Sequence, residues 1–286
     1  MTSSLFPIAL CLLSAVTVAA TNTFVKKGGD VLSARMIVSI AMALSVLPFV
    51  FFVPLPTQTV WAALLVSVIV HWGYQFAMIR ALHRGDLSLV FPVMRGLSPL
   101  LTAIMAALLL AEMPSVLGWT GLIIATAALI VFALPEELED SQRRLQRAAL
   151  IWAVITALGI AAYSVADARG ARLTGHVGTY VVWLFLFDWI GITAAMIVSR
   201  RGRIWAGVKP QLWNGTLGGI LGTISYGSAL WAFTLADTAN VTAIRETSVV
   251  FGAIFGALFL RERFGRRRIA AASVLAAGLM LLEFAP

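Results

Sequence analysis

Two arginines interrupt apolar segments in which a charged side chain needs a specific partner. Arg95 lies in the apolar run from Leu87 to Leu110, and Arg245 lies in residues 238–260. Burying an arginine in lipid is costly unless protein or water surrounds it. The guanidinium keeps its charge, and its planar fork fits two oxygens of a carboxylate or phosphonate. The pair predicts an anion-binding site; the alternative is that each arginine holds an internal acid or helix-end carbonyls.

Acidic side chains in the apolar segments extend this candidate site. Glu246 follows Arg245, whereas the matching position after Arg95 is Gly96, and Asp188 lies in a separate apolar run. Either carboxylate is expected to hold an ammonium group of a substrate or to carry a coupling proton. An internal salt bridge is an equally open interpretation for both.

His71 is a further candidate for proton coupling, because imidazole changes its charge near neutral pH. Tyr74 and Gln75 lie three and four residues further on, so they share a helix face with it. Aromatic residues expected to line a substrate cavity with polar tips are Tyr163, Trp183, Tyr226 and Trp231. Packing in the core or against lipid is the competing interpretation for each.

Composition requires that these residues sit in a membrane protein. Hydrophobic residues make up 60% of the 286-residue chain and charged residues 12%, with a mean hydropathy of +0.93. A soluble domain of this size needs more charged residues than this to cover its water-exposed surface. The net charge of +8 is therefore interpreted as loop charge, not as a nucleic-acid footprint. The single cysteine excludes an intramolecular disulfide, and the sequence predicts no cofactor and no metal site.

Ten segments are long and apolar enough to cross a bilayer, which takes about 20 residues. They are residues 5–25, 31–53, 59–82, 87–110, 115–134, 148–168, 177–198, 212–235, 238–260 and 267–284. The connections are short except for the polar stretch 135–147, which we interpret as a linker between residues 1–134 and 148–286. The predicted fold is an all-α membrane protein.

The two halves repeat each other. Shifted by 150 residues, "RGLSPLLTAIMAALLLAE" (Arg95–Glu112) aligns with "RETSVVFGAIFGALFLRE" (Arg245–Glu262), and eight of the 18 positions are identical. Each half holds an odd number of predicted spans, five, so the second half enters the membrane upside down. This predicts two inverted five-helix repeats with a site near the midplane between them.

Loop charge predicts the orientation. Three of the 21 Lys and Arg residues lie well inside spans, and 16 of the other 18 lie on or beside odd-numbered connections. Positive-inside reasoning puts those connections in the cytoplasm and both termini in the periplasm of an inner (plasma) membrane protein.

Each repeat closes its fourth span with a glutamate, in "LLLAE" and "LFLRE". With the ten spans, this pattern resembles the EamA family of the drug/metabolite transporter superfamily over essentially the whole chain. "RGDLSLVFPVMRGLSPLL" and "AIRETSVVFGAIFGALFLRER" are similar to a bacterial subgroup associated with phosphonate utilisation. The resemblance implies secondary transport of small metabolites without ATP, through a cavity that opens alternately to each side. Glu112 and Glu262 are interpreted as structural, favouring the positive N-terminus of a following helix.

Two prolines, Pro92 and Pro99, flank Arg95, whereas the counterparts of these prolines in the second repeat are Thr242 and Val249. This predicts a bend in the fourth span around the site, which the ninth span does not need.

The function favoured by the sequence is secondary active export or exchange of a small anionic or zwitterionic metabolite, such as an amino acid or aminophosphonate. The lipid bilayer, the substrate, a proton and a second copy of the chain are the expected partners. One alternative is an organic cation such as choline, held by acids and an aromatic box. Another is a flippase that moves a phospholipid. An intramembrane enzyme is disfavoured, because no HExxH or comparable catalytic motif occurs.

Overall fold

The computed structural model describes residues 5–27, 30–82, 84, 87–133, 143–200, 204–260 and 266–283, and every regular element in these ranges is a helix. In chain order the elements are α1 (Leu5–Lys27), α2 (Val31–Val46), η1 (Leu47–Phe51), α3 (Gln58–Leu82), α4 (Leu87–Leu110), α5 (Val116–Ala133), α6 (Arg143–Leu173), α7 (Val177–Arg200), α8 (Ile204–Val208), η3 (Lys209–Gln211), α9 (Leu212–Phe233), α10 (Thr238–Arg245), α11 (Ser248–Leu260) and α12 (Arg266–Glu283).

Among the described residues, six helical segments are long and apolar enough to cross a membrane: α1, α2 with η1, α3, α4, α6 and α7. Shorter apolar stretches lie in α5 and α12, at Val116–Val131 and Ala270–Leu282. The prediction of an all-helical protein with several membrane-spanning helices is confirmed. The count of ten spans stays a prediction.

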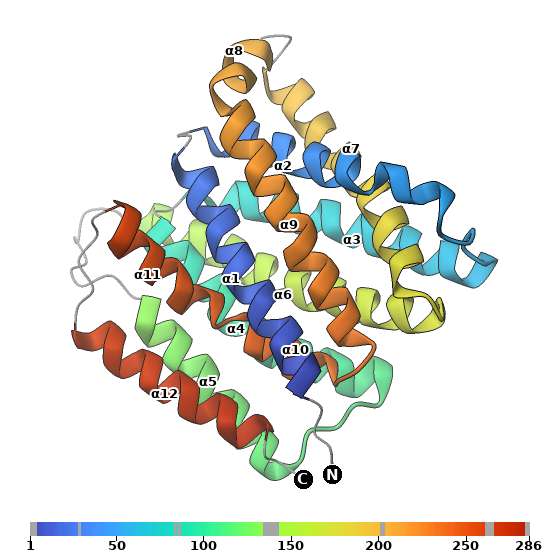
Figure 1. Cartoon of the computed structure of the whole chain (residues 1–286). Coiled ribbons are helices and arrows are strands. Elements are labelled where there is room, and N and C mark those ends of the chain that lie inside the picture. The colour runs from blue at the N-terminus through green and yellow to red at the C-terminus, as the bar shows by residue number, and fades with distance from the viewer. Residues whose placement is uncertain are drawn as a thin grey trace.

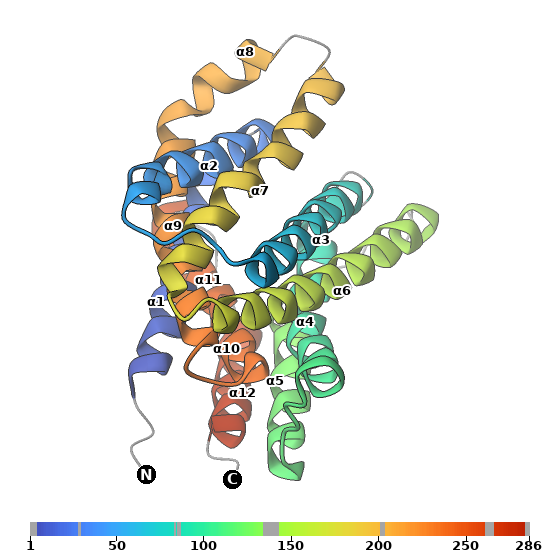
Figure 2. The same ribbon diagram turned by 90° about the vertical axis from the view of Figure 1, so that its right-hand side faces the viewer.

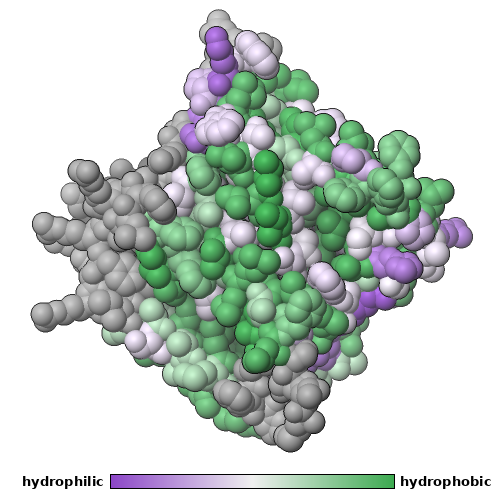
Figure 3. Space-filling model, in the orientation of Figure 1, coloured by the Kyte–Doolittle hydropathy of each residue, from purple (hydrophilic) through white to green (hydrophobic). Residues whose placement is uncertain are grey.

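The outer surface is apolar, as a surface in contact with lipid has to be. Large side chains such as Phe51, Leu108 and Val198 are mostly exposed. Figure 3 shows hydrophobic residues over most of the face formed by α1 and α9, with hydrophilic residues gathered towards the upper and right-hand tips. A soluble protein would cover such a face with charge.

The helices of the two halves pack against each other in matched pairs. α1 packs on α9 and α3 on α6, while α2 contacts α7 and α5 contacts α12. Figure 1 shows α1 and α9 crossing the centre of the bundle, with α5 and α12 paired at its lower left edge; Figure 2 shows α3 beside α6. In the predicted repeat, α1 corresponds to α6, α3 to α9, and α4 to α10 with α11. Exchanging each helix for its counterpart converts the α1–α9 contact into the α6–α3 contact. It likewise turns the α1–α11 contact into the α6–α4 contact.

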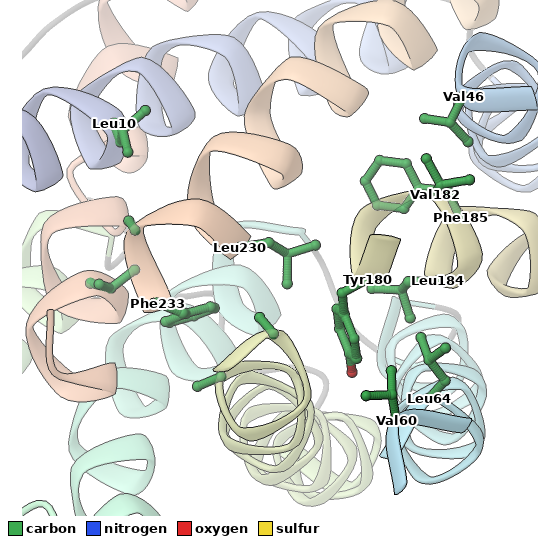
Figure 4. Close-up of a cluster of buried hydrophobic side chains, with 14 of the residues drawn as sticks. Leu10, Val46, Val60, Leu64, Tyr180, Val182, Leu184, Phe185, Leu230 and Phe233 are labelled. Carbon is green, nitrogen blue, oxygen red and sulfur yellow. The ribbon is translucent and has the colours of Figure 1, made fainter. Parts of the chain in front are cut away.

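The largest buried apolar cluster lies where α1, α3, α6, α7 and α9 meet. Its centre is the fully buried ring of Tyr180, which Figure 4 shows near Val60, Leu64 and Leu184. The hydroxyl of this tyrosine is polar, so burial requires a hydrogen-bond partner, and that partner belongs to the functional site described below.

The prediction that the ninth span needs no bend is wrong, whereas a bend in the fourth span stays a prediction. α4 is one continuous helix through Pro92 and Pro99, whereas the ninth segment breaks between α10 and α11 at Glu246 and Thr247. There the bonding pattern shortens: Thr247 N–H donates to Ile244 O (3.1 Å) and Val249 N–H to Glu246 O (3.0 Å). The Thr247 hydroxyl also donates to Ile244 O (2.7 Å), so it competes with the backbone for that acceptor.

α5 and α12 approach so closely that their backbones touch at two glycines. A Cβ on Gly278 would lie 2.7 Å from Ala125 N and 2.8 Å from Gly121 O. Gly278→Ala is therefore expected to push the helices apart and to destabilise the protein by about 1–3 kcal/mol, measured as a lower melting temperature in detergent. Gly73→Ala is the matched control, since a Cβ there meets nothing within 4 Å. Equal melting temperatures for the two variants would contradict the close approach.

Candidate substrate-binding site

Asp167 on α6 is the centre of the polar interior. Its carboxylate is fully buried, accepts hydrogen bonds from three hydroxyls and contacts an imidazole nitrogen, and these four side chains lie on three other helices. Oδ1 accepts from the hydroxyls of Ser67 and Tyr180 (2.9 Å for Tyr180), and Oδ2 contacts His71 Nε2 at 2.9 Å and accepts from the Tyr226 hydroxyl. One carboxylate thus ties α3, α6, α7 and α9 together.

A second carboxylate, Asp188 on α7, lies on the other side of the His71 ring. His71 Nδ1 is 3.7 Å from Asp188 Oδ1. Gln75 Nε2 donates to both oxygens of Asp188, at 3.1 and 3.3 Å, and Trp72 Nε1 donates to its backbone carbonyl at 3.2 Å. The imidazole therefore sits between two acids, in a part of the bundle that water has little access to.

Aromatic rings connect His71 to Arg245. The Tyr163 ring stacks on the His71 ring with centroids 4.3 Å apart, and Tyr226 packs edge-on against His71 at 5.7 Å. Tyr74 meets Tyr163 at 5.1 Å. The guanidinium carbon of Arg245 lies 5.2 Å from the centroid of the Tyr226 ring, a cation–π contact.

Arg95 and Glu246 form an ion pair across the two halves. Arg95 Nη1 donates to Glu246 Oε1 at 3.0 Å, and the Ser98 hydroxyl donates to the same oxygen at 3.3 Å. The other oxygen, Oε2, is buried and has no hydrogen-bond partner in the described part of the chain. For Arg95, the structure therefore shows the internal acid that the sequence left as an alternative.

Arg245, at the C-terminal end of α10, lacks such an acid. Its Nε donates to the Ser14 hydroxyl at 2.9 Å, and Ser14 in turn bonds Ser225, which joins α1, α9 and α10. Arg245 is 9% exposed, and no carboxylate of the described residues lies within ion-pair distance of it. The two arginines therefore differ: one is neutralised by the protein, the other is not.

Glu112 holds the opposite end of α10. Its Oε2 accepts from the Thr238 backbone N–H at 2.7 Å, and Oε1 pairs with Arg172, which also donates to the Phe233 and Ala236 carbonyls. The carboxylate therefore stabilises a helix N-terminus as predicted, but that helix is α10 and not the following α5. Glu262 lies outside the described residues.

The structure brings most, not all, of the predicted site residues together. The cluster contains Arg95, Arg245, Glu246, Asp188, His71, Tyr74, Gln75, Tyr163 and Tyr226. Trp231 is 46% exposed and packs on Phe6 at the surface, and Trp183 packs with Trp61 and Phe187 in a separate aromatic group. Lipid contact explains Trp231 better than a cavity does.

Asp167 is not among the site residues that the sequence predicted. One feature of the sequence could have pointed to it: an acid near the end of an apolar segment needs buried hydrogen-bond donors. The residues that supply them, Ser67, Tyr180 and Tyr226, are spread over more than 150 positions, so no spacing pattern links them.

Gly170 makes room for the Tyr180 ring that donates to Asp167. A Cβ at this position would lie 2.2 Å from Tyr180 Cε2 and 2.6 Å from its hydroxyl oxygen. Gly170→Ala is expected to displace the ring, break its hydrogen bond and destabilise the protein by about 1–3 kcal/mol. The melting temperature in detergent measures this loss, and Gly73→Ala should leave it unchanged or raise it. A Gly170→Ala protein as stable as the native one would contradict this role of Tyr180.

No group of three or more His, Cys, Asp or Glu residues that fits a metal ion occurs in the described part of the chain. The paired arginines, buried acids and aromatic rings in an apolar helical bundle together define a site for a small polar solute in a membrane protein.

Comparison with known proteins agrees with this class. The model of the EamA-like transporter family matches residues 5–134 and 147–284, and the chain belongs to that family. No curated protein matches. A solved structure titled "Crystal structure of protein" is similar to the chain, with a TM-score of 0.76 over 96% of this chain and 95% of that one at 16% identity, which speaks for the fold alone. The protein is a multi-pass membrane transporter of small solutes.

Proposed function

We propose that the protein is a secondary active exporter or exchanger of a small anionic or zwitterionic metabolite, such as an amino acid or aminophosphonate, working by alternating access. The observation that carries this proposal is the buried guanidinium of Arg245, which has no acidic partner among the described residues. A buried charge without a counter-ion is destabilising, and a substrate anion would supply the missing charge.

Arg245 is also held in a geometry suited to an anion. The Ser14 hydroxyl occupies only Nε, and the face of Tyr226 supports the guanidinium plane. The terminal nitrogens are the ones that bind a carboxylate or phosphonate in two-point contact.

Glu246 extends the site to a zwitterion. Its Oε2 is buried without a hydrogen-bond donor, while Oε1 is used by Arg95 and Ser98. An ammonium group supplies the kind of donor that Oε2 lacks. Arg245 and Glu246 are adjacent at the break between α10 and α11, and transporters commonly place substrate sites at such discontinuous helices.

The same proposal includes two inverted five-helix repeats, residues 1–134 and 148–286, joined by residues 135–147, which move relative to each other around the site. The exchangeable contacts between matched helices support it. A location in the inner membrane with periplasmic termini, a homodimer and the phosphonate-associated subgroup remain predictions from the sequence.

A ligand screen tests the proposal. The purified protein is heated in detergent with glycine, aminomethylphosphonate, methylphosphonate or choline, alongside Arg245→Met and, as matched control, Arg80→Met. Arg80 is exposed at the end of α3, over the Phe76 ring. We expect one of the first three compounds to raise the melting temperature of the native and Arg80→Met proteins but not of Arg245→Met.

Stabilisation by choline alone, with Arg245→Met responding like the native protein, would contradict the proposal in favour of an organic-cation transporter. Stabilisation by phospholipid in place of all four soluble compounds would instead favour a flippase.

A further inference from the structure

The hydrogen bonds around Asp167 fix the proton positions on His71. An ionised carboxylate has about four acceptor positions. At Asp167 three of them accept from hydroxyls, and His71 Nε2 lies against the fourth. An ionised Asp167 acts only as an acceptor in these four contacts. His71 Nε2, 2.9 Å away, must then carry a hydrogen and donate it.

The remaining imidazole nitrogen, Nδ1, is the one that gains or loses a proton. It faces Asp188 Oδ1 at 3.7 Å. Without a proton on either group, a lone pair and a carboxylate oxygen face each other in a buried site, which is repulsive. A single proton on Nδ1 or on Asp188 turns this contact into an attraction.

Asp188 is built differently from Asp167. Its side chain is 17% exposed, and within the described chain its only side-chain hydrogen-bond donor is Gln75. A proton on Asp188 can therefore exchange with the surroundings, whereas Asp167 is fully buried behind its four hydrogen-bonding neighbours. The other groups facing His71 are Tyr163 on α6, Tyr226 on α9 and, beyond Tyr226, Arg245 on α10.

We infer that His71 Nδ1 and Asp188 together bind one exchangeable proton, and that this proton is the coupling ion of the transport cycle. The inference rests on the proposed function and assigns its coupling ion. The proton passes between this pair and water, and no other bond forms or breaks. Tyr226 links the proton site to the anion site, because its hydroxyl bonds Asp167 while its ring supports Arg245.

Charge balance makes the coupling favourable. With the proton bound, His71, Arg95 and Arg245 offset Asp167, Asp188 and Glu246; without it, the cluster carries one uncompensated negative charge. An anionic group bound at Arg245 adds negative charge. Bound substrate is therefore expected to raise the affinity of the protein for the proton, and the bound proton to raise its affinity for the substrate by the same factor. This favours movement of substrate and proton together, so export in the proposed cycle follows the outward gradient of the substrate and carries a proton with it.

Nitrogen NMR of protein labelled with ¹⁵N-histidine tests the proton site without any substrate. The chain has three histidines, and loss of one signal set in His71→Gln assigns the resonance. We expect Nε2 of His71 to stay protonated throughout, while Nδ1 changes with pH. Asp188→Asn should shift the Nδ1 transition to lower pH, because a neighbouring negative charge is gone. Asp237→Asn, an exposed acid whose side chain makes no capping bond to α10, is the matched control.

Transport in proteoliposomes tests the coupling, with glycine and aminomethylphosphonate as probes. A pH gradient that is acidic outside should drive net uptake by the native protein several-fold above the rate at equal pH. Asp188→Asn should lose the response to the gradient, so that its net uptake is the same with and without a pH difference. A native protein whose net flux ignores the gradient, or a variant that responds like the native protein, would overturn the inference. If the native protein exchanges neither probe, the proposed function fails, whereas the NMR spectra still decide whether Nδ1 and Asp188 share the proton.

Discussion

Replacing Asp167 with asparagine is expected to destabilise the protein by about 3–5 kcal/mol and to abolish transport. The carboxylate accepts from Ser67, His71, Tyr180 and Tyr226 and so joins four helices. An asparagine keeps the shape but replaces one acceptor oxygen by an NH2 group, which points hydrogens at two donors. It also removes the carboxylate charge beside His71.

Thermal unfolding in detergent measures this loss, and Asp237→Asn is the matched control. Asp237 is exposed, and its side chain makes no capping bond, so its variant should melt with the native protein. An Asp167→Asn protein that also melts with the native one would show that the four-donor cluster does not hold the bundle together.

Changing Arg95 or Arg245 to methionine is expected to have opposite effects on stability and on ligand binding. Arg95→Met leaves Glu246 buried with Ser98 as its remaining donor in the site, so we expect a loss of stability of about 3 kcal/mol or more. Arg245→Met leaves no acid stranded, so the protein should keep most of its stability. It should, however, bind an anionic ligand at least about tenfold more weakly, since the guanidinium contributes charged hydrogen bonds.

A double variant separates the structural role of Arg95 from a role in binding. Arg95→Met with Glu246→Leu removes both charges of the pair, and melting should recover towards the native temperature. If the double variant is no more stable than Arg95→Met, the ion pair is not the reason for the loss. If Arg245→Met is the less stable of the two single variants, the assignment of roles is reversed.

The sequence predicted the class of fold well because lipid imposes simple rules. Apolar segments of sufficient length and a polar linker at residues 135–147 are visible without any three-dimensional information. The repeat of Arg95 as Arg245 at a fixed offset drew attention to the two arginines, and both lie in the polar interior.

The partners of those arginines were beyond sequence reasoning. Glu246 follows Arg245 in the chain but pairs with Arg95, because successive residues on a helix point about 100° apart and the fourth and ninth segments meet face to face. Likewise, the four donors to Asp167 come from helices far apart in the chain, and only packing brings them together.

The break in the ninth segment shows where local rules misled. Prolines suggested an interruption of α4, yet the helix continues through both of them. At Glu246 the ion pair with Arg95 and the bond from Thr247 to Ile244 O favour a different backbone path. No strong helix breaker marks this position in the sequence.

Exchange of labelled substrate in proteoliposomes tests most directly whether Arg245 binds the anionic group of the substrate. The probe is whichever of glycine, aminomethylphosphonate or methylphosphonate stabilises the native protein most. The native and Arg80→Met proteins are predicted to exchange it at similar rates, and Arg245→Met at least about tenfold more slowly at limiting probe concentration. Exchange by Arg245→Met as fast as by the native protein would contradict the central claim.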